Sequence, residues 1–168
     1  ETVFALSSAF AAENSVDQVW RQTLERYVDD KGFVDYDSLN DNRVEFDQYI
    51  AKIQTTGPDS TPQHYSSVYS RLAYYINAYN AMVFKGVIDS GPEKVSVWKG
   101  WVSGLNFFIR MDIVVDGKKT NLKKLEDKVV RVQFKDPRIH AALNCASISC
   151  PRLIREPYVA EKLDQQLD

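Results

Sequence analysis

The sequence lacks any block of like charge and any long apolar run. Lysine and arginine total 21 and aspartate and glutamate total 23, so the formal net charge is -2, and the two kinds are interspersed. A protein that follows a phosphate backbone needs a basic block, so we expect no nucleic-acid partner. No segment approaches the roughly 18 uncharged apolar residues of a spanning helix, so we expect no membrane span.

Cofactor motifs are also missing. The seven glycines form no phosphate-binding loop, and the cysteines and histidines do not have the paired spacing of zinc ligands. We therefore expect no cofactor. The partner that we expect is a small-molecule or peptide substrate. Cysteine is scarce, but the two that are present make an even number, which suits an oxidising compartment.

Length and composition indicate one domain. The chain has 168 residues, and its 44% hydrophobic content is enough for one core. Within residues 1–15, "VFALSSAFA" resembles the end of a signal peptide, although a basic region is missing; a frayed amphipathic segment is the alternative. We predict a single domain over residues 16–168, preceded by this N-terminal segment, in a periplasmic or secreted protein.

Apolar residues at three- and four-residue steps predict helices in the N-terminal half. The first follows a capping Ser15 and ends before Gly32, the second carries residues 46–53, and a long third extends from about residue 63 to about residue 89. Residues 31–42, between the first two, have the composition of a turn-rich connector.

The C-terminal half contains strand signals. β-Branched and aromatic residues flank Asp116-Gly117, a dipeptide that suits a two-residue turn, and they predict a hairpin of residues 108–115 with residues 118–120. Asn121 can cap a short helix, and Pro157 suits the first turn of a last helix. Helices before strands, without regular alternation, indicate the α+β class: a helical N-terminal half with a small antiparallel sheet in the C-terminal half.

One segment concentrates reactive side chains. "DPRIHAALNCASISC", residues 136–150, contains His140, Asn144 and both cysteines, Cys145 and Cys150. Its small apolar residues suit a buried strand, in which His140 and Cys145 would point to opposite faces unless the chain turned between them. A thiol at a turn or a helix start would be deprotonated more readily.

Several interpretations of this segment remain open. The cysteines could form a disulfide, or they could be inert buried thiols beside a hydrogen-bonded histidine. A third interpretation is a nucleophilic cysteine activated by His140, with Glu126 as the acidic residue that orients the imidazole. Metal ligation by His140 and the cysteines is weaker, because gaps of four residues are uncommon between zinc ligands. The other histidine, His64, falls in a predicted solvated loop.

The long predicted helix carries two asparagines. On a helical wheel Asn80 falls among apolar residues, with Asn77 near the edge of that arc. A buried amide without a partner costs about 1–3 kcal/mol, so Asn80 needs one. The partner could be a neighbouring loop that Asn80 braces, or a ligand in a pocket.

Three stretches together resemble the family catalogued as domain of unknown function 547. They are "YYINAYNAMVFKGVI", "NLKKLED" and "DPRIHAALNCASISCPRL", and the likeness spans residues 20–168. The family pattern falls on Asn77, Tyr79, Asn80, Glu126, Arg138, His140, Asn144, Cys145, Ser147, Cys150 and Pro151. The resemblance implies a compact α+β domain that gathers these polar residues at one site, and a distant relation to papain- or transglutaminase-like enzymes. In those enzymes the cysteine precedes the histidine, whereas here both cysteines follow it.

Two functions fit these residues. The first is a thiol-dependent hydrolase or acyl transferase that acts on amide or thioester bonds of small peptides, with Cys145 as nucleophile, His140 as base and then acid, and Glu126 fixing the ring. Cys150 is the alternative nucleophile, and Asn80 or Asn144 would donate to the oxyanion. The substrate-binding candidates are Asn77, Asn80, Arg138, Asn144 and Ser147.

The second function is a non-catalytic binding or scaffold domain of the cell envelope. In it Cys145 and Cys150 form a structural pair, and the aromatic surface around Trp98 and Trp101 contacts a partner.

Overall fold

The computed structural model describes residues 18–91, 107–144, 146 and 151–168. The predictions for the N-terminal segment 1–15 and for the start of the first helix lie outside the described residues, as do those for Trp98, Trp101, Cys145, Ser147 and Cys150.

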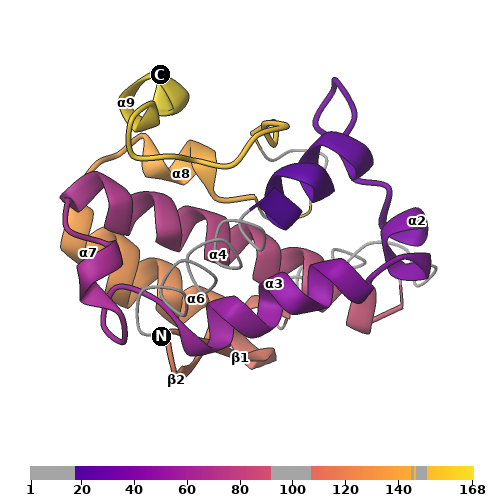
Figure 1. Ribbon diagram of the computed structural model, residues 1–168, viewed down its shortest axis with the longest axis horizontal. Coiled ribbons are helices and arrows are strands. Elements are labelled where there is room, and N and C mark those ends of the chain that lie inside the picture. Colours follow the sequence, from indigo (N-terminus) through magenta and orange to yellow (C-terminus); the bar gives the residue numbers. More distant parts are fainter. Residues whose placement is uncertain (1–17, 92–106, 145, 147–150) are drawn as a thin grey trace, which may run out of the picture.

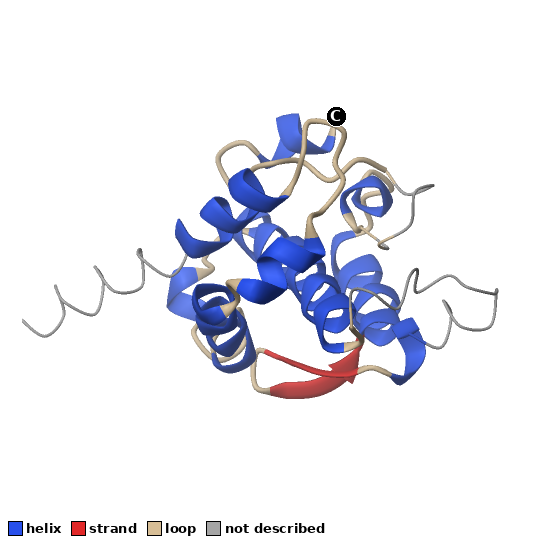
Figure 2. Ribbon diagram, turned by 90° about the vertical axis from the view of Figure 1, so that its right-hand side faces the viewer, coloured by secondary structure: helices blue, strands red, loops and turns tan. Residues whose placement is uncertain are grey.

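Helices form most of the described chain, and one antiparallel hairpin lies in its C-terminal half, which confirms the predicted α+β class (Figures 1 and 2). A helix covers residues 18–27. The further elements are α2 Tyr36–Asp41, α3 Val44–Thr55, η1 Pro62–His64, α4 Val68–Asp89, β1 Asp112–Val115, β2 Lys118–Asn121, α6 Leu122–Lys124, η2 Leu125–Val130, α7 Arg131–Phe134, α8 Ile139–Ala142 and α9 Leu163–Leu167.

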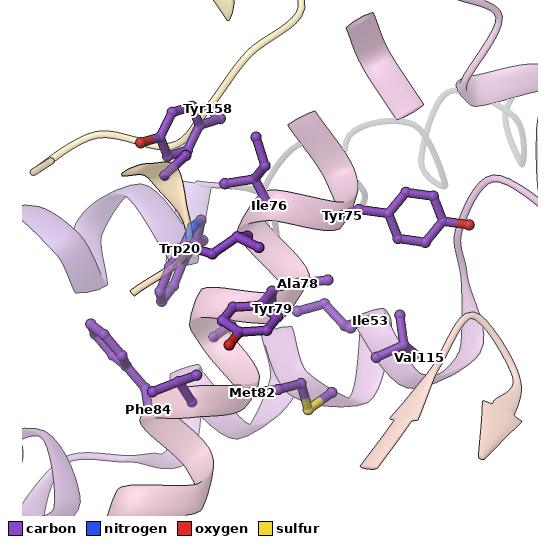
Figure 3. Packing of buried hydrophobic residues seen from close by; sticks show 14 of the residues in the cluster. Trp20, Ile53, Tyr75, Ile76, Ala78, Tyr79, Met82, Phe84, Val115 and Tyr158 are labelled. Carbon is purple, nitrogen blue, oxygen red and sulfur yellow. The ribbon is translucent and has the colours of Figure 1, made fainter. Parts of the chain in front are cut away.

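Helix α4 lies at the centre of the molecule, with α8 and α9 on one side of it and the hairpin on the other (Figure 1). Thirteen of its 22 residues are buried, so it contributes the middle of the hydrophobic core. Trp20 of the first helix stacks on Tyr49 of α3 at 5.5 Å and meets the edge of Phe84 of α4 at 5.3 Å. Figure 3 shows Trp20 and Tyr158 gathered on one side of α4.

The long helix was predicted to start about five residues too early. Ser67 caps α4: its hydroxyl accepts from the Ser70 N–H at 2.9 Å, and the Ser67 N–H donates back to the Ser70 hydroxyl. This capping box fixes the helix start, and Pro62–His64 forms a separate turn of 3₁₀ helix.

The first two predicted helices are confirmed over residues 18–27 and 44–55, but the connector between them was wrong in part. Residues 36–41 form α2, because the side chain of Asp35 accepts from the Ser38 N–H at 3.0 Å and caps the first turn. A single short turn of helix buries only Leu39 and has too few residues to show a period.

The hairpin prediction is confirmed at its turn and corrected at its first strand. Val115 pairs with Lys118, and the turn residues Asp116 and Gly117 have φ angles of +53° and +72°, as a type I′ turn requires. Residues 108–110, expected to begin the first strand, are helical instead, together with Phe107. The N–H of Met111 donates to the carbonyl of Phe107, which closes that helical turn before β1 begins.

The hairpin turn is anchored to the loop after α3. The buried carboxylate of Asp116 accepts from the backbone N–H groups of Asp59 at 2.6 Å and Ser60 at 3.0 Å. Gly57 passes so close to this carboxylate that no side chain fits there.

Asn121 caps the next helix, as predicted, by accepting from the Lys124 N–H at 2.8 Å. The helix then widens into a π-helical stretch, η2, before it returns to α geometry in α7. Lys135, with a φ of +50°, ends it ahead of Asp136-Pro137.

Two C-terminal predictions were wrong. The small apolar run around His140 forms the helix α8 and not a strand, because its buried residues Ile139, Ala142 and Leu143 fall at helical steps. The last helix starts at Leu163 and not at Pro157. The Gln166 side chain accepts from the N–H of Val159 and donates to the carbonyl of Pro157, so these backbone groups are bonded outside a helix.

Candidate functional site

Helix α8 places His140 at the surface beside Glu126 of η2. The His140 Nδ1 lies 3.8 Å from the Glu126 Oε1 and 3.3 Å from the Arg131 Nη2. The His140 side chain is 76% exposed, whereas that of Glu126 is only 19% exposed. The fold therefore brings the predicted imidazole and carboxylate together, and it adds an arginine that the sequence patterns did not single out.

The π-helical stretch explains how Arg131 reaches this place. In an α-helix two residues five apart are rotated by roughly 140° from each other, so their side chains would not meet. Here the Arg131 N–H donates to the carbonyl of Glu126, five residues earlier, as in a π-helix. The two side chains consequently lie on one face, where Arg131 donates to the Glu126 Oε1 from Nε at 3.0 Å and from Nη2 at 2.6 Å.

A buried tyrosine of α4 lies next to this cluster. Burial raises the pKa of Tyr79, and the nearby negative charge of Glu126 raises it further. The hydrogen bond to Glu126 in turn raises the pKa of Arg131. Tyr79 therefore stays protonated, and the charge of Glu126 is balanced by Arg131.

The contact between Arg131 and His140 fixes the form of the neutral ring. A guanidinium can only donate, so Nδ1 must accept, and the ring proton then sits on Nε2. We expect Arg131→Met to move the ring proton of neutral His140 from Nε2 to Nδ1, because the Glu126 Oε1 loses its arginine partner and can accept from an Nδ1–H. The ¹⁵N shifts of the neutral ring would report the proton moving to Nδ1, with His64 as the internal control. An unchanged His140 tautomer would contradict the prediction.

The segment after His140 is held by Asn80, which is 1% exposed. Its amide nitrogen donates to the carbonyl of Ala142 at 3.0 Å, and its oxygen accepts from the N–H of Asn144 at 2.9 Å. The side-chain oxygen of Asn144 then accepts from the N–H of Ala146 at 2.7 Å. The partner of Asn80 is therefore the neighbouring loop, which was one of the two alternatives expected. The bonded residues of this loop include Asn144 and Ala146, the two neighbours of Cys145 in the sequence.

Two other candidates have their polar atoms bonded away from His140. The oxygen of Asn77 accepts from the Tyr158 N–H at 3.0 Å and from the Trp20 Nε1 at 3.3 Å, and its nitrogen donates to the Tyr158 carbonyl. The guanidinium of Arg138 forms ion pairs with three carboxylates. They belong to Asp136, Asp164 and Asp168.

The ion pairs of Arg138 join α8 to the C-terminal helix. The hydrogen bond from Arg138 lowers the pKa of Asp136, and the pKa of Arg138 is raised by the same bond. Arg138 therefore ties its own segment to α9 at the surface of the protein.

Three further observations concern membrane spans, metal ligands and His64. Among the residues that the structure describes, no helix is long and apolar enough to cross a membrane. Within the same residues, no three histidine, cysteine or acidic side chains are grouped as metal ligands would be. His64, predicted to lie in a solvated loop, is exposed at the end of η1.

Comparison with known proteins identifies one family. No curated protein and no solved structure matches the chain. The model of the family described as "Protein of unknown function, DUF547" matches residues 63–168, which is more than half of the chain. This match contains α4, the Glu126–Arg131–His140 cluster and the loop held by Asn80. The chain therefore belongs to the DUF547 family.

Proposed function

We propose that this protein is a cysteine-dependent hydrolase or acyl transferase that acts on amide or thioester bonds of small peptides. In this proposal Cys145 is the nucleophile, His140 is the base and then the acid, and Glu126 orients the ring. The supporting observation is the 3.8 Å between the His140 Nδ1 and the Glu126 Oε1, on a ring that is open to solvent. Such a carboxylate beside an imidazole is the usual support for a catalytic base.

The proposed reaction starts with transfer of the Cys145 thiol proton to the His140 Nε2. The thiolate then attacks the substrate carbonyl carbon and forms a C–S bond. The imidazolium returns the proton to the leaving amine or thiol as its bond to carbon breaks. Water or a second nucleophile, deprotonated by His140, then releases the acyl group. This first transfer requires an unprotonated Nε2, and therefore the tautomer that carries its proton on Nδ1. Arg131, which donates to Nδ1 in the structure, must first release it so that the Nδ1–H can be donated to Glu126.

The oxyanion that forms in this reaction needs a hydrogen-bond donor. Asn80 suits this role poorly, because its amide nitrogen already donates to Ala142. The amide nitrogen of Asn144 is the better candidate, since it donates to no other residue within the described part of the chain.

Thiol reactivity tests this proposal directly. We expect iodoacetamide to alkylate Cys145 at pH 7 faster than it alkylates an unfolded cysteine, and His140→Ala to slow the reaction about tenfold or more, because the thiolate loses its base. Glu126→Gln should slow it as well. Peptide mass spectrometry after timed quenching would measure the rates separately for Cys145 and Cys150.

The chain offers matched controls for both changes. His64→Ala removes the only other histidine, and Asp127→Asn removes the neighbouring carboxylate; neither should slow the alkylation. Equal rates in the wild type and in His140→Ala would refute the proposal. So would a mass about 2 Da lower without reductant, since a closed disulfide leaves no nucleophile.

A non-catalytic binding or scaffold domain of the cell envelope is the second candidate. It is favoured by the bonding of Asn77 and Asn80, whose side chains hold backbone segments of the fold.

For either function we propose a periplasmic or secreted location, supported by the apolar, small-residue segment within residues 1–15. Fractionation of cells that make the protein would test the location, and its recovery in the cytoplasm would refute it.

A further inference from the structure

A cleft of about 490 Å³ opens between the helix of residues 18–27, the first half of α4 and residues 157–161. This volume falls within the range of small-molecule sites, about 300–1,000 Å³. Neither Glu126 nor His140 lines the cleft, so it is separate from the cluster described above. The two are connected through α4, because Asn77 borders the cleft and Asn80, one turn later, holds the loop after His140.

Aromatic side chains form part of the cleft lining. Four tyrosines line it: Tyr49, Tyr65, Tyr74 and Tyr158. The rings of Tyr65 and Tyr74 meet edge to face, with their centroids 5.1 Å apart. The Tyr74 hydroxyl donates a hydrogen bond to the carbonyl oxygen of Thr56 at 2.9 Å. Asn77 has both amide atoms bonded to the protein. A ligand in this cleft would therefore lie against aromatic rings.

Two opposite charges from different elements also line the cleft. Arg21 comes from the helix of residues 18–27, and Glu161 from the segment before α9. Throughout the described chain, neither side chain forms an ion pair or a hydrogen bond with another residue. Arg43, Arg131 and Arg155, in contrast, each pair with a carboxylate. Arg21 and Glu161 thus remain able to bind an anionic and a cationic group.

We infer that the cleft binds a short peptide with both termini free. Its carboxylate would pair with Arg21, its ammonium with Glu161, and its side chains would pack on the tyrosine rings. A simple anion would leave Glu161 unused, and a neutral saccharide would use neither charge, so a zwitterionic peptide fits these residues better. This inference concerns binding alone and does not rest on the thiol chemistry.

Calorimetric titration with a dipeptide of alanine and phenylalanine would test it. Since a hydrogen bond to a charged group is among the stronger kinds, we expect amidation of the carboxylate, or acetylation of the amine, to weaken binding about tenfold. The Cys145→Ala variant should bind the dipeptide as the wild type does. Failure of the proposed chemistry would therefore leave this result unchanged.

Single substitutions assign each terminus to its partner. Arg21→Ala should abolish the difference in affinity between the free and the amidated dipeptide. Glu161→Gln should abolish the difference in affinity between the free and the acetylated dipeptide. Arg26→Ala and Glu25→Gln are matched controls, because they change the same charges outside this cleft and should preserve both differences. Absence of binding by the wild type, or equal binding of free and doubly capped dipeptide, would overturn the inference.

Discussion

Replacing Asn80 by alanine should lower the free energy of unfolding by about 3 kcal/mol. The substitution removes both hydrogen bonds that the amide makes, to the carbonyl of Ala142 and to the N–H of Asn144. Each backbone group left unpaired in a buried place costs about 1–3 kcal/mol. Urea denaturation, followed by circular dichroism, would measure the change, and amide exchange over residues 142–146 should accelerate at the same time.

An exposed asparagine provides the control for this experiment. Asn42 also donates from its side chain to a backbone carbonyl, that of Ser38 at 3.0 Å, but at the surface. Water can replace that bond, so Asn42→Ala should change the stability by no more than about 0.5 kcal/mol. If both variants lost the same small amount, Asn80 would not be the brace of the loop.

Replacing Gly57 by alanine should destabilise the protein by about 3 kcal/mol. The added Cβ would lie 2.6 Å from the Tyr74 hydroxyl oxygen and 2.6 Å from the Asp116 Cγ, closer than carbon atoms are found to such neighbours. Neither neighbour can move freely, because Asp116 accepts from Asp59 and Ser60 and the Tyr74 hydroxyl donates to a backbone carbonyl. The substitution therefore adds overpacking to the loss of buried hydrogen bonds.

A substitution at Gly117 tests whether crowding causes the loss of stability expected for Gly57→Ala. A Cβ at Gly117 would meet nothing within 4 Å, and only its φ of +72° disfavours a side chain. Gly117→Ala should therefore cost about 1 kcal/mol. Thermal and urea denaturation of the two variants would compare them, and a Gly57→Ala variant as stable as Gly117→Ala would contradict the account of the anchored hairpin turn.

Long, regular parts of the fold were predictable from the sequence, because a helical period repeated over many residues has few alternatives. The end of α4 at Asp89, the helix over residues 44–55 and the turn at Asp116-Gly117 were all predicted. The cap at Asn121 was predicted too, since one side-chain oxygen at the right position is a local signal.

Short segments were not predictable, because tertiary contacts decide them. The four residues of α8 are too few to separate a buried strand from a helix. Pro157 suits a helix start by itself, but the Gln166 side chain, nine residues later, bonds to its carbonyl and holds the segment open. Such a pairing follows from the fold and leaves no periodic pattern in the sequence.

The candidate site was predicted in part. Glu126 and His140 do lie together, as expected from the sequence. The third member, Arg131, was missed because a spacing of five residues pairs side chains only where a helix widens. The partner of Asn80 could not be identified either, since its contacts are 62 and 64 positions away in the chain.

Trp20 stacks on Tyr49 and contacts Phe84, and these contacts limit how far the protein can be truncated from its N-terminal side. The match to the family model begins at residue 63, yet Trp20 and Tyr49 precede that point and share one hydrophobic core with the residues that follow it. A fragment trimmed to the matched region would expose an aromatic surface to solvent and would tend to aggregate. The stretch that the family model matches is thus shorter than the stretch that builds the hydrophobic core.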